Sequence, residues 1–386
     1  MDDFDDLTLD KLRHRRSEKW ARHPPDVLPS TPAEMDFLPA PAIRDVLAAA
    51  VAAGDLGYAR ADGSGLAEAF AGFAARRFGW SVDAEGVVAL PEIMVGVAEL
   101  LRVLTPPGAG VVIMTPAYPP FFSVIAEVGR RAVEVPLLGP DAAQRLPLDG
   151  IRAAFAAGAR AFLLCNPHNP TGYVATREEL LAVAEIVAEH DGVVLSAEIH
   201  APLTLNGASH VPFCSLPTAV NALVLTSASK GWNIPGLKCA LAVAGSAPMH
   251  DALAQLPVDL PDRVGHLGVL ATTAAYADGE EWLDGLLSYL GENRGALANL
   301  LAERAPLVRY RPGQATYLAW LDCRELGLGD DPAAYFLEHG RVALTPGPLF
   351  GEPGHGFARL NFGTPRAVLE QTIERIAHAA ATPSQS

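Results

Sequence analysis

The amino-acid sequence predicts an α/β protein whose larger part is a mostly parallel β-sheet flanked by helices. Three observations predict this class. Short apolar runs recur through the middle of the 386-residue chain, and a turn and then a helical pattern follow each of them. Runs that are apolar at nearly every position are typical of strands buried on both faces of a parallel sheet. The 35 Gly and 32 Pro residues suit many short connections between strands and helices.

Five of these runs are expected to form buried strands: 111–114 (VVIM), 161–165 (AFLLC), 193–196 (VVLS), 223–226 (LVLT) and 240–244 (ALAVA). A helix is expected between the second and third runs. Thr176 can cap it and Glu179, three residues later, completes a capping box before a series of apolar positions. The apolar stretch 46–53 is short and lies between two Asp residues, so we expect a helix of a globular domain and not a membrane span.

The pattern changes after about residue 275. Leucines recur at helical spacing over 282–304, which predicts a long amphipathic helix whose apolar face is interrupted near Asn293. Alternating segments at 316–322 and 358–362 follow, as expected for strands of a smaller α+β domain. Because a chain of 386 residues is longer than one compact hydrophobic core usually accommodates, we expect two domains. Residues 45–275 would form the large domain, and residues 1–44 and 276–386 the small one.

Composition excludes several classes of protein. Half of the residues are apolar, which rules out an intrinsically disordered chain. The formal net charge of −15 argues against binding to nucleic acid or anionic membranes, and the basic stretch 13–16 fits a solvated helix face. The first ten residues are acidic and lack a secretory apolar region. The cysteines form no CxxC pair, so we expect free thiols in the cytoplasm and neither metal nor redox chemistry; they are Cys165, Cys214, Cys239 and Cys323.

Polar and aromatic residues follow four of the apolar runs. Ligands of open α/β sheets bind beyond the carboxyl ends of the strands, so these segments predict a site. They are TPAYPPF (115–121), NPHNPTG (166–172), SAEIH (196–200) and SASK (227–230). Lys230 lies there among small and hydroxyl residues, where a lowered pKa makes a lysine a nucleophilic amine. The alternative is an ordinary surface lysine.

Taken together, these strings resemble the fold-type I enzymes that depend on pyridoxal 5′-phosphate (PLP), the aminotransferase class I/II superfamily. The resemblance covers nearly the whole chain and is strongest to the cystathionine β-lyase-like (C–S β-lyase) branch. The strings that carry it are RRSEKW (15–20), AEMDF (33–37), GY (57–58), TPAYPPFF (115–122), LLCNPHNPTG (163–172), EIHAPL (198–203), SASKGWNIPGLK (227–238) and RLNFGTP (359–365).

The resemblance implies a role for individual residues. Lys230 would hold PLP as a Schiff base and move protons at the substrate Cα. Asn169 would donate a hydrogen bond to the cofactor phenolate oxygen, and Tyr118 would stack on the pyridine ring. Arg359 would bind the substrate carboxylate through both arms of its guanidinium. Each has a plainer alternative: Asn169 as a turn residue, Tyr118 as core and Arg359 as a surface residue.

The resemblance also implies how the cofactor phosphate is held. Backbone N–H groups at a helix start would cradle it, with hydroxyl groups and a lysine beside them. One further contact would come from the neighbouring subunit, which implies a homodimer with shared active sites. The residues so implied are Ile93, Met94, Ser227, Ser229, Lys238 and, from the other subunit, Tyr58. His200 fits a structural role better than a catalytic one, and His168 fits a loop residue.

The chain departs from the family pattern at several of these places. The family string Ser-Asp-Glu-Ile-His is SAEIH here, so Ala197 replaces an Asp that normally keeps the pyridine nitrogen protonated. Without it the ring is a weaker electron sink. Glu198 cannot substitute, since adjacent strand residues face opposite ways. Other departures are Thr31-Pro32 for Trp-Val, Glu92 for the usual phosphate-loop Gly, and TPGPLF (345–350) for Asn-Ser-Gly-Pro-Thr-Phe.

The leading functional hypothesis is β-elimination from a cysteine S-conjugate or a cystathionine-like thioether, giving pyruvate, ammonia and a thiol. Elimination tolerates a weak sink because the electrons leave with sulfur. One alternative is decarboxylation-coupled oxidative deamination of an S-cysteinyl conjugate, as in relatives from antibiotic biosynthesis. An aminotransferase is a further alternative, disfavoured by Ala197. A PLP-binding regulatory protein is the alternative outside enzyme classes.

Overall fold

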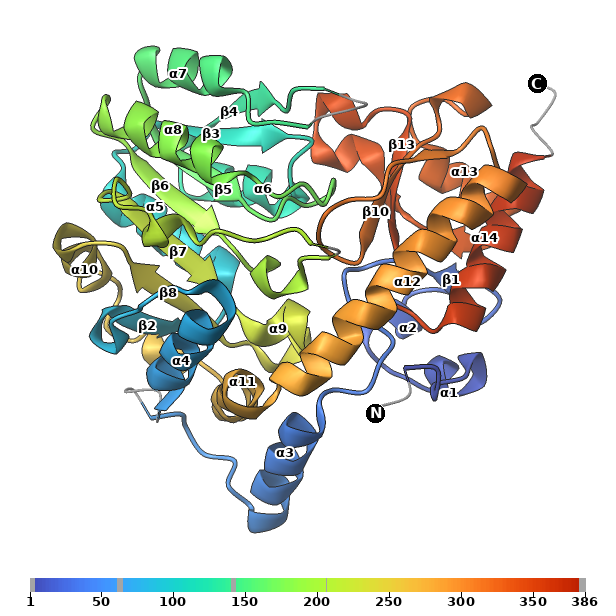
Figure 1. The fold of residues 1–386 in the computed structure, drawn as a ribbon, viewed down its shortest axis with the longest axis horizontal. Helices are drawn as coiled ribbons and strands as arrows, with labels where there is room; N and C mark the ends of the chain where they lie inside the picture. The colour runs from blue at the N-terminus through green and yellow to red at the C-terminus, as the bar shows by residue number, and fades with distance from the viewer. Residues whose placement is uncertain (1–3, 61–64, 140–143, 206, 382–386) are drawn as a thin grey trace.

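The computed structural model describes residues 4–60, 65–139, 144–205 and 207–381. Within them the largest sheet has seven strands in the order β2-β8-β7-β6-β5-β3-β4 (Figure 1). Their bounds are β2 Val87–Leu90, β3 Gly110–Thr115, β4 Arg131–Pro136, β5 Ala159–Cys165, β6 Val193–Ala197, β7 Ala222–Thr226 and β8 Ala240–Ala244. Only β8 runs against the other strands of this sheet. The predicted α/β class with a mostly parallel sheet is therefore confirmed.

All five apolar runs form strands of this sheet, whereas its two edge strands escape the sequence pattern. Most residues of the edge strands β2 and β4 are half-buried or exposed; Arg131 and Glu134 interrupt the apolar residues of β4, whereas β2 is a four-residue apolar run that was not predicted as a strand. The inner strands are buried at nearly every position, with Arg160 and Ala244 as exceptions, because helices cover both faces of the sheet. Neighbouring residues therefore enter different cores: Val112 and Met114 join one apolar cluster, and Val111 and Ile113 join the other.

Two layers of helices enclose the sheet. Helices α5, α6 and α10 supply residues to one apolar cluster, and α3, α4, α7, α8 and α11 supply residues to the other. Their bounds are α3 Pro41–Ala53, α4 Leu66–Phe78, α5 Ile93–Leu104, α6 Pro119–Glu127, α7 Leu148–Ala156, α8 Arg177–Ala188, α10 Ala247–Leu253 and α11 His266–Asp278. The predicted capping box of α8 is present, since Thr176 and Glu179 bond reciprocally.

A second, antiparallel sheet lies in the C-terminal part, in the order β12-β13-β10-β9. Its strands are β9 Arg309–Tyr310, β10 Leu318–Asp322, β12 Thr345–Pro346 and β13 Phe357–Asn361, and its helices are α12 Glu280–Arg304, α13 Pro332–His339 and α14 Arg366–Ala380. Asn293 lies fully buried in the apolar face of α12, where its amide donates to the carbonyls of Phe362 and Thr364 at 3.2 and 2.8 Å. These partners explain the interruption in the leucine pattern.

The N-terminal segment packs on the C-terminal part, as the ribbon shows (Figure 1). It forms α1 Leu9–Arg13, α2 Glu18–Ala21 and β1 Leu28–Pro29, and β1 pairs in parallel with β11 Val342–Ala343. A buried ion pair between Lys19 and Asp36, with 2.6 Å between Nζ and Oδ2, ties α2 to the chain that follows β1. No helix of the described ranges is long and apolar enough to cross a membrane.

The expected domain boundaries, at 44/45 and 275/276, fall inside α3 and α11. A helix continues its hydrogen bonds through both positions, so neither is a linker. We therefore propose the two-domain division with its joins at the ends of these helices.

Candidate active site

The polar segments that follow the parallel strands lie at one edge of the large sheet. Strands β5, β6 and β7 end in register, with Cys165 opposite Ala197 and Ala197 opposite Leu225. Since parallel strands share a carboxyl edge, the loops that carry Tyr118, Asn169 and Lys230 begin there. The charges of Arg359 and Glu92 shift the pKa values of both Lys230 and Tyr118, which places these groups within one electrostatic neighbourhood.

Lys230 lies on the short helix α9, Ala228–Gly231, directly after β7. Ser227 caps this helix by accepting from the Ser229 backbone N–H at 3.1 Å. The Lys230 Nζ donates to the Ala33 carbonyl at 2.6 Å. Burial, and next the Arg359 charge, lower the pKa of Lys230 to about 8. Its amine therefore holds a neutral fraction near neutral pH, as a nucleophile or proton acceptor requires.

Arg359 brings the C-terminal sheet into the same site. This arginine is buried on β13, and its Nη1 donates to Asn169 Oδ1 at 3.0 Å while Nη2 donates to Thr345 Oγ1 at 3.2 Å. Burial lowers the pKa of Arg359 to about 10, so it stays a cation at neutral pH. Because Asn169 uses its oxygen on Arg359, its NH₂ group is left to donate to an acceptor such as a phenolate.

Ala197 lies in an apolar wall of the site. Ala197, Cys165 and Leu225 are buried in one cluster, and the half-buried Tyr118 packs against it. Burial raises the pKa of Tyr118, and it raises the pKa of the Cys165 thiol to about 11, so both stay neutral.

The buried carboxylate of Glu198 serves a different part of the fold, as strand alternation predicts. It accepts from the Ser196 hydroxyl and the Phe213 backbone N–H at 2.8 Å each. His210 Nε2 lies 2.9 Å from its second oxygen. These three bonds satisfy the carboxylate, so it is not available to replace the missing Asp.

The site expected to bind the cofactor phosphate consists of the N-terminus of helix α5 and the side chain of Lys238. Helix α5 begins at Ile93, and its N-cap residue Glu92 makes no side-chain cap to it. The first N–H groups of a helix lack intrahelical acceptors and bind anions readily. Lys238 Nζ lies 3.0 Å from Glu92 Oε2, so a carboxylate already holds this lysine. Ser227 donates its hydroxyl hydrogen to the Cys239 carbonyl at 2.6 Å, so in this structure that hydrogen is not available to a phosphate.

Two buried histidines flank the site. Burial, then the charges of Lys230 and Arg359, lower the pKa of His200 to about 3, and burial lowers that of His168 to about 4. Both are neutral at ordinary pH. His168 Nδ1 lies 2.9 Å from Thr171 Oγ1, within its own turn. His200 packs edge-on against Tyr317, with 6.3 Å between ring centres.

Several groups of the site have no role predicted from the sequence. The Ala33 carbonyl accepts from Lys230 and also from the Tyr317 hydroxyl, at 3.0 Å. A backbone carbonyl has no sequence signal, and Tyr317 reads as a plain strand residue. Thr345 and Thr31 contact each other at 2.8 Å between hydroxyls. In the sequence, these two threonines stand out only because both depart from the family pattern.

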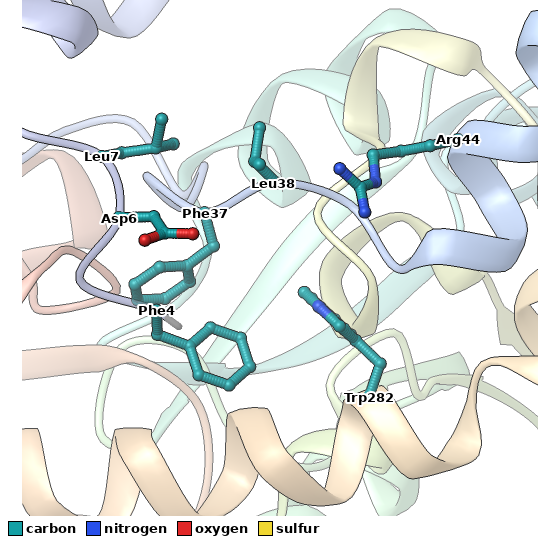
Figure 2. Close-up of a pocket in the computed structure, with 7 residues that line it drawn as sticks. All are labelled: Phe4, Asp6, Leu7, Phe37, Leu38, Arg44 and Trp282. Atoms are coloured by element: carbon teal, nitrogen blue, oxygen red, sulfur yellow. The ribbon is translucent and has the colours of Figure 1, made fainter. Parts of the chain in front are cut away.

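A separate pocket of about 120 Å³ lies under the N-terminal segment (Figure 2). It contains none of the residues predicted for the active site. Its lining residues are Phe4, Asp6, Leu7, Phe37, Leu38, Arg44 and Trp282. Phe4 packs edge-on against Phe37 at 5.3 Å between ring centres, so this pocket is a gap in an aromatic contact that anchors the N-terminal segment.

The site fits PLP by its own chemistry. It offers a lysine amine of lowered pKa and a donor amide held by an arginine. It also offers an aromatic ring over an apolar wall, and a helix start for a phosphate. A model of the family "Aminotransferase class I and II" matches residues 34–376, so the chain belongs to this family, whose members use PLP.

Known proteins place the chain in the carbon–sulfur lyase branch of that family. It is 44% identical to a Mycobacterium leprae protein provisionally named cystathionine β-lyase, over 97% of this chain and 98% of the relative. It is 37% identical to the cystathionine β-lyase of Corynebacterium glutamicum, over 96% and 98%. Its fold matches a Corynebacterium diphtheriae crystal structure, provisionally a PLP-dependent β-cystathionase, with a TM-score of 0.93, 36% identity and coverage of 98% and 99%.

A first prediction concerns Glu92, because its carboxylate and a cofactor phosphate would compete for Lys238. Replacing Glu92 with Gly or Gln is expected to tighten PLP binding by roughly 2- to 5-fold, the size of a solvent-screened charge contact. Lys238→Ala is expected to weaken it. Absorbance titration of the apoprotein with PLP measures both. Unchanged or weaker binding in Glu92→Gln would show that this charge does not face the phosphate.

Proposed function

We propose that this chain is a PLP-dependent carbon–sulfur β-lyase that cleaves a cysteine S-conjugate or a cystathionine-like thioether. One observation carries the proposal. At the carboxyl edge of the sheet, the Lys230 amine has a lowered pKa and lies within the electrostatic influence of the buried cation Arg359. The names of the relatives support the same class of reaction. Water and the thioether R–S–CH₂–CH(NH₃⁺)–COO⁻ give the thiol R–SH, pyruvate and ammonium.

Each residue has a definite task in this reaction. PLP, when bound, supplies the conjugated ring that stabilises negative charge at the substrate Cα. Arg359 holds the substrate carboxylate and so orients the Cα–H bond. Lys230, as a neutral amine, takes the Cα proton and, as the ammonium, can give it to the departing sulfur to form the thiol. Asn169 donates its free NH₂ hydrogen to the cofactor oxygen, and the thiolate leaves from Cβ.

Direct assay tests the proposal. PLP-loaded protein is mixed with L-cystathionine or S-alkyl-cysteines, and pyruvate, free thiol, aldehyde and oxygen uptake are followed. Pyruvate and thiol in equal amounts are expected. Aldehyde with oxygen uptake would instead indicate oxidative deamination with loss of the carboxylate. No product from a broad thioether panel would favour a regulatory PLP-binding protein.

Ala197 favours elimination over transamination. Ala197 and the buried residues Cys165 and Leu225 around it carry no carboxylate that could keep a pyridine nitrogen protonated, so the PLP ring, when bound, would be a weak electron sink. In elimination the departing sulfur carries the electrons away, whereas transamination must return them through the ring to a cofactor carbon. A weak sink therefore costs transamination more.

A second prediction follows from Ala197. With 2-oxoglutarate present, Ala197→Asp is expected to raise the ratio of intact thioether keto acid to free thiol by roughly tenfold, the effect of one pKa unit at the ring nitrogen. Chromatography of both products measures this ratio. Ala197→Asn is the control, since it has a similar size and no charge. An equal ratio in the Asp and Asn variants would contradict the role of charge at this position.

A homodimer with shared active sites is part of the proposal. Tyr58 is 92% exposed, and Leu56 and Val51 beside it are 61% and 60% exposed. Val51 lies in the last turn of helix α3, and Leu56 and Tyr58 follow this helix. Helix α3 projects from the body of the molecule (Figure 1). A second copy of this chain covers them in the proposal and receives Tyr58 at its phosphate end. The cytoplasmic location is also proposed, and four free cysteines support it.

A third prediction tests shared sites. Sedimentation should give twice the 40.6 kDa mass of the chain. At limiting PLP, Tyr58→Ala and Lys230→Ala should each be poorly active alone. Subunits of the two variants, mixed after dissociation, should regain about a quarter of wild-type activity, because half of the dimers are mixed and each contains one intact site. No recovery on mixing, with dimers re-formed, would contradict sharing.

A further inference from the structure

The two threonines that depart from the family pattern meet beside the substrate-binding arginine. Parallel pairing puts Pro29 opposite Ala343, and the same register continued by two residues brings Thr31 to Thr345. Antiparallel pairing puts Thr345 opposite Arg359, on the same face of the C-terminal sheet. The result is a row of three side chains from three segments that are far apart in the sequence.

The hydrogen bonds in this row leave one hydrogen without a partner. Arg359 Nη2 donates to Thr345 Oγ1 at 3.2 Å, and the two threonine hydroxyls lie 2.8 Å apart. An arginine only donates, so it uses none of the hydroxyl hydrogens. The contact between Thr31 and Thr345 uses one of their two hydrogens, whichever of them donates. The other hydrogen has no acceptor among the hydrogen bonds of the described residues, and both threonine side chains are half-buried, so it remains available to a bound ligand.

The location of this hydrogen points to the substrate. Two residues after Thr31, the Ala33 carbonyl accepts from the reacting amine of Lys230. The pair thus lies next to Arg359, which would bind the substrate carboxylate, and Thr31 is on the same segment as the carbonyl that holds the Lys230 amine. The Arg359 cation also polarises Thr345, which strengthens any hydrogen bond that the pair donates to an anion.

We propose that the hydroxyl pair of Thr31 and Thr345 donates a hydrogen bond to a carboxylate oxygen of the amino-acid substrate. This inference rests on the proposed amino-acid chemistry of the site and adds specificity residues to it. The carboxylate has two sources, the α-carboxylate held by Arg359 or a second carboxylate at the end of the substrate side chain. The chemistry of recognition is the same for both.

Titration with amino acids that carry no sulfur separates this inference from C–S cleavage. PLP-loaded protein is titrated with L-norleucine, which has an apolar tail, and with L-2-aminoadipate, which has a second carboxylate. The visible absorbance change gives each Kd. Because either single variant leaves one hydroxyl hydrogen, the test uses the double variant T31V/T345V. T31S/T345S is the matched control that keeps both hydroxyls, and Thr218→Val removes a half-buried threonine before the amino end of β7.

In T31V/T345V the Kd is expected to rise about tenfold, as for a hydrogen bond to a charged group. An equal rise for both ligands supports the proposal and assigns the α-carboxylate. A rise for L-2-aminoadipate alone supports it and assigns the distal carboxylate. No rise for either ligand, or an equal rise in T31S/T345S, overturns it. Wild-type protein that binds these ligands but releases no thiol from thioethers would instead remove the lyase proposal.

Discussion

Replacing Lys230 with alanine is expected to abolish attachment of PLP and to reduce C–S cleavage at least about 10³-fold, because in the proposed mechanism one amine both binds the cofactor and moves the Cα proton. Loss of the visible absorbance band of bound PLP measures the first effect, and pyruvate release measures the second. Lys11→Ala is the control, since that lysine is exposed and its side-chain Nζ donates to the Asp6 carbonyl at 3.0 Å. A Lys230→Ala protein that keeps the band of a lysine-bound cofactor would contradict the assignment.

The pKa of Lys230 gives this experiment a pH dependence. Burial and the Arg359 charge disfavour the ammonium form and lower its pKa to about 8. An ammonium is not a nucleophile, so the rate at which apoprotein attaches PLP should rise with pH through about 8 and then level off. Stopped-flow absorbance over a pH series measures that midpoint. A rate that does not change between pH 6 and pH 9, roughly, would contradict a titrating lysine.

Replacing Arg359 with lysine is expected to lower kcat/KM by roughly 100-fold, mainly by raising KM, while PLP stays attached. Losing a bidentate contact to a carboxylate inside a buried site costs about 3 kcal/mol. Arg309→Lys is the control, because Arg309 is an exposed residue of β9 that pairs with Glu325. Loss of the PLP band together with activity would indicate that Arg359 acts by holding Asn169 and not the substrate.

The charge of Arg359 adds a second readout. Arg359→Gln removes a cation that destabilises the Lys230 ammonium, so the pKa of Lys230 should rise. The midpoint for PLP attachment should therefore move to higher pH, whereas Arg359→Lys should leave it nearly in place. If Arg359 had only a structural role, the pH midpoint for PLP attachment would move by the same amount in Arg359→Gln and Arg359→Lys.

The core strands of the fold could be predicted because their burial produces local patterns of apolar residues. Strands β3, β5 and β6 are apolar at nearly every position, since helices cover them on both sides. The edge strand β4 could not be found this way, because most of its residues are not buried. Asn293 interrupts the leucine pattern of α12, and its reason lies in two carbonyls about 70 positions further along the chain.

The candidate site divides in the same way. Lys230, Asn169 and Tyr118 follow buried strands, where the position in the sequence already indicates a ligand site. Arg359 rests on the family resemblance, and its contact with Asn169 spans 190 residues. The pairing of Lys238 with Glu92 could not be predicted, because it depends on where β8 and α5 meet in space.

The sequence by itself therefore determined the α/β class, and it indicated the edge of the sheet where a ligand site is expected and Lys230 as the lysine proposed to hold the cofactor. Hydrophobic periodicity and strand-end position are local properties, so the order of residues is enough to reveal them. Only the tertiary structure decided that the Ala33 carbonyl holds the Lys230 amine and that Thr31, Thr345 and Arg359 form one row. The threonine–arginine row joins three distant segments through strand registers, and the Lys230 contact adds a fourth; no local pattern contains such contacts.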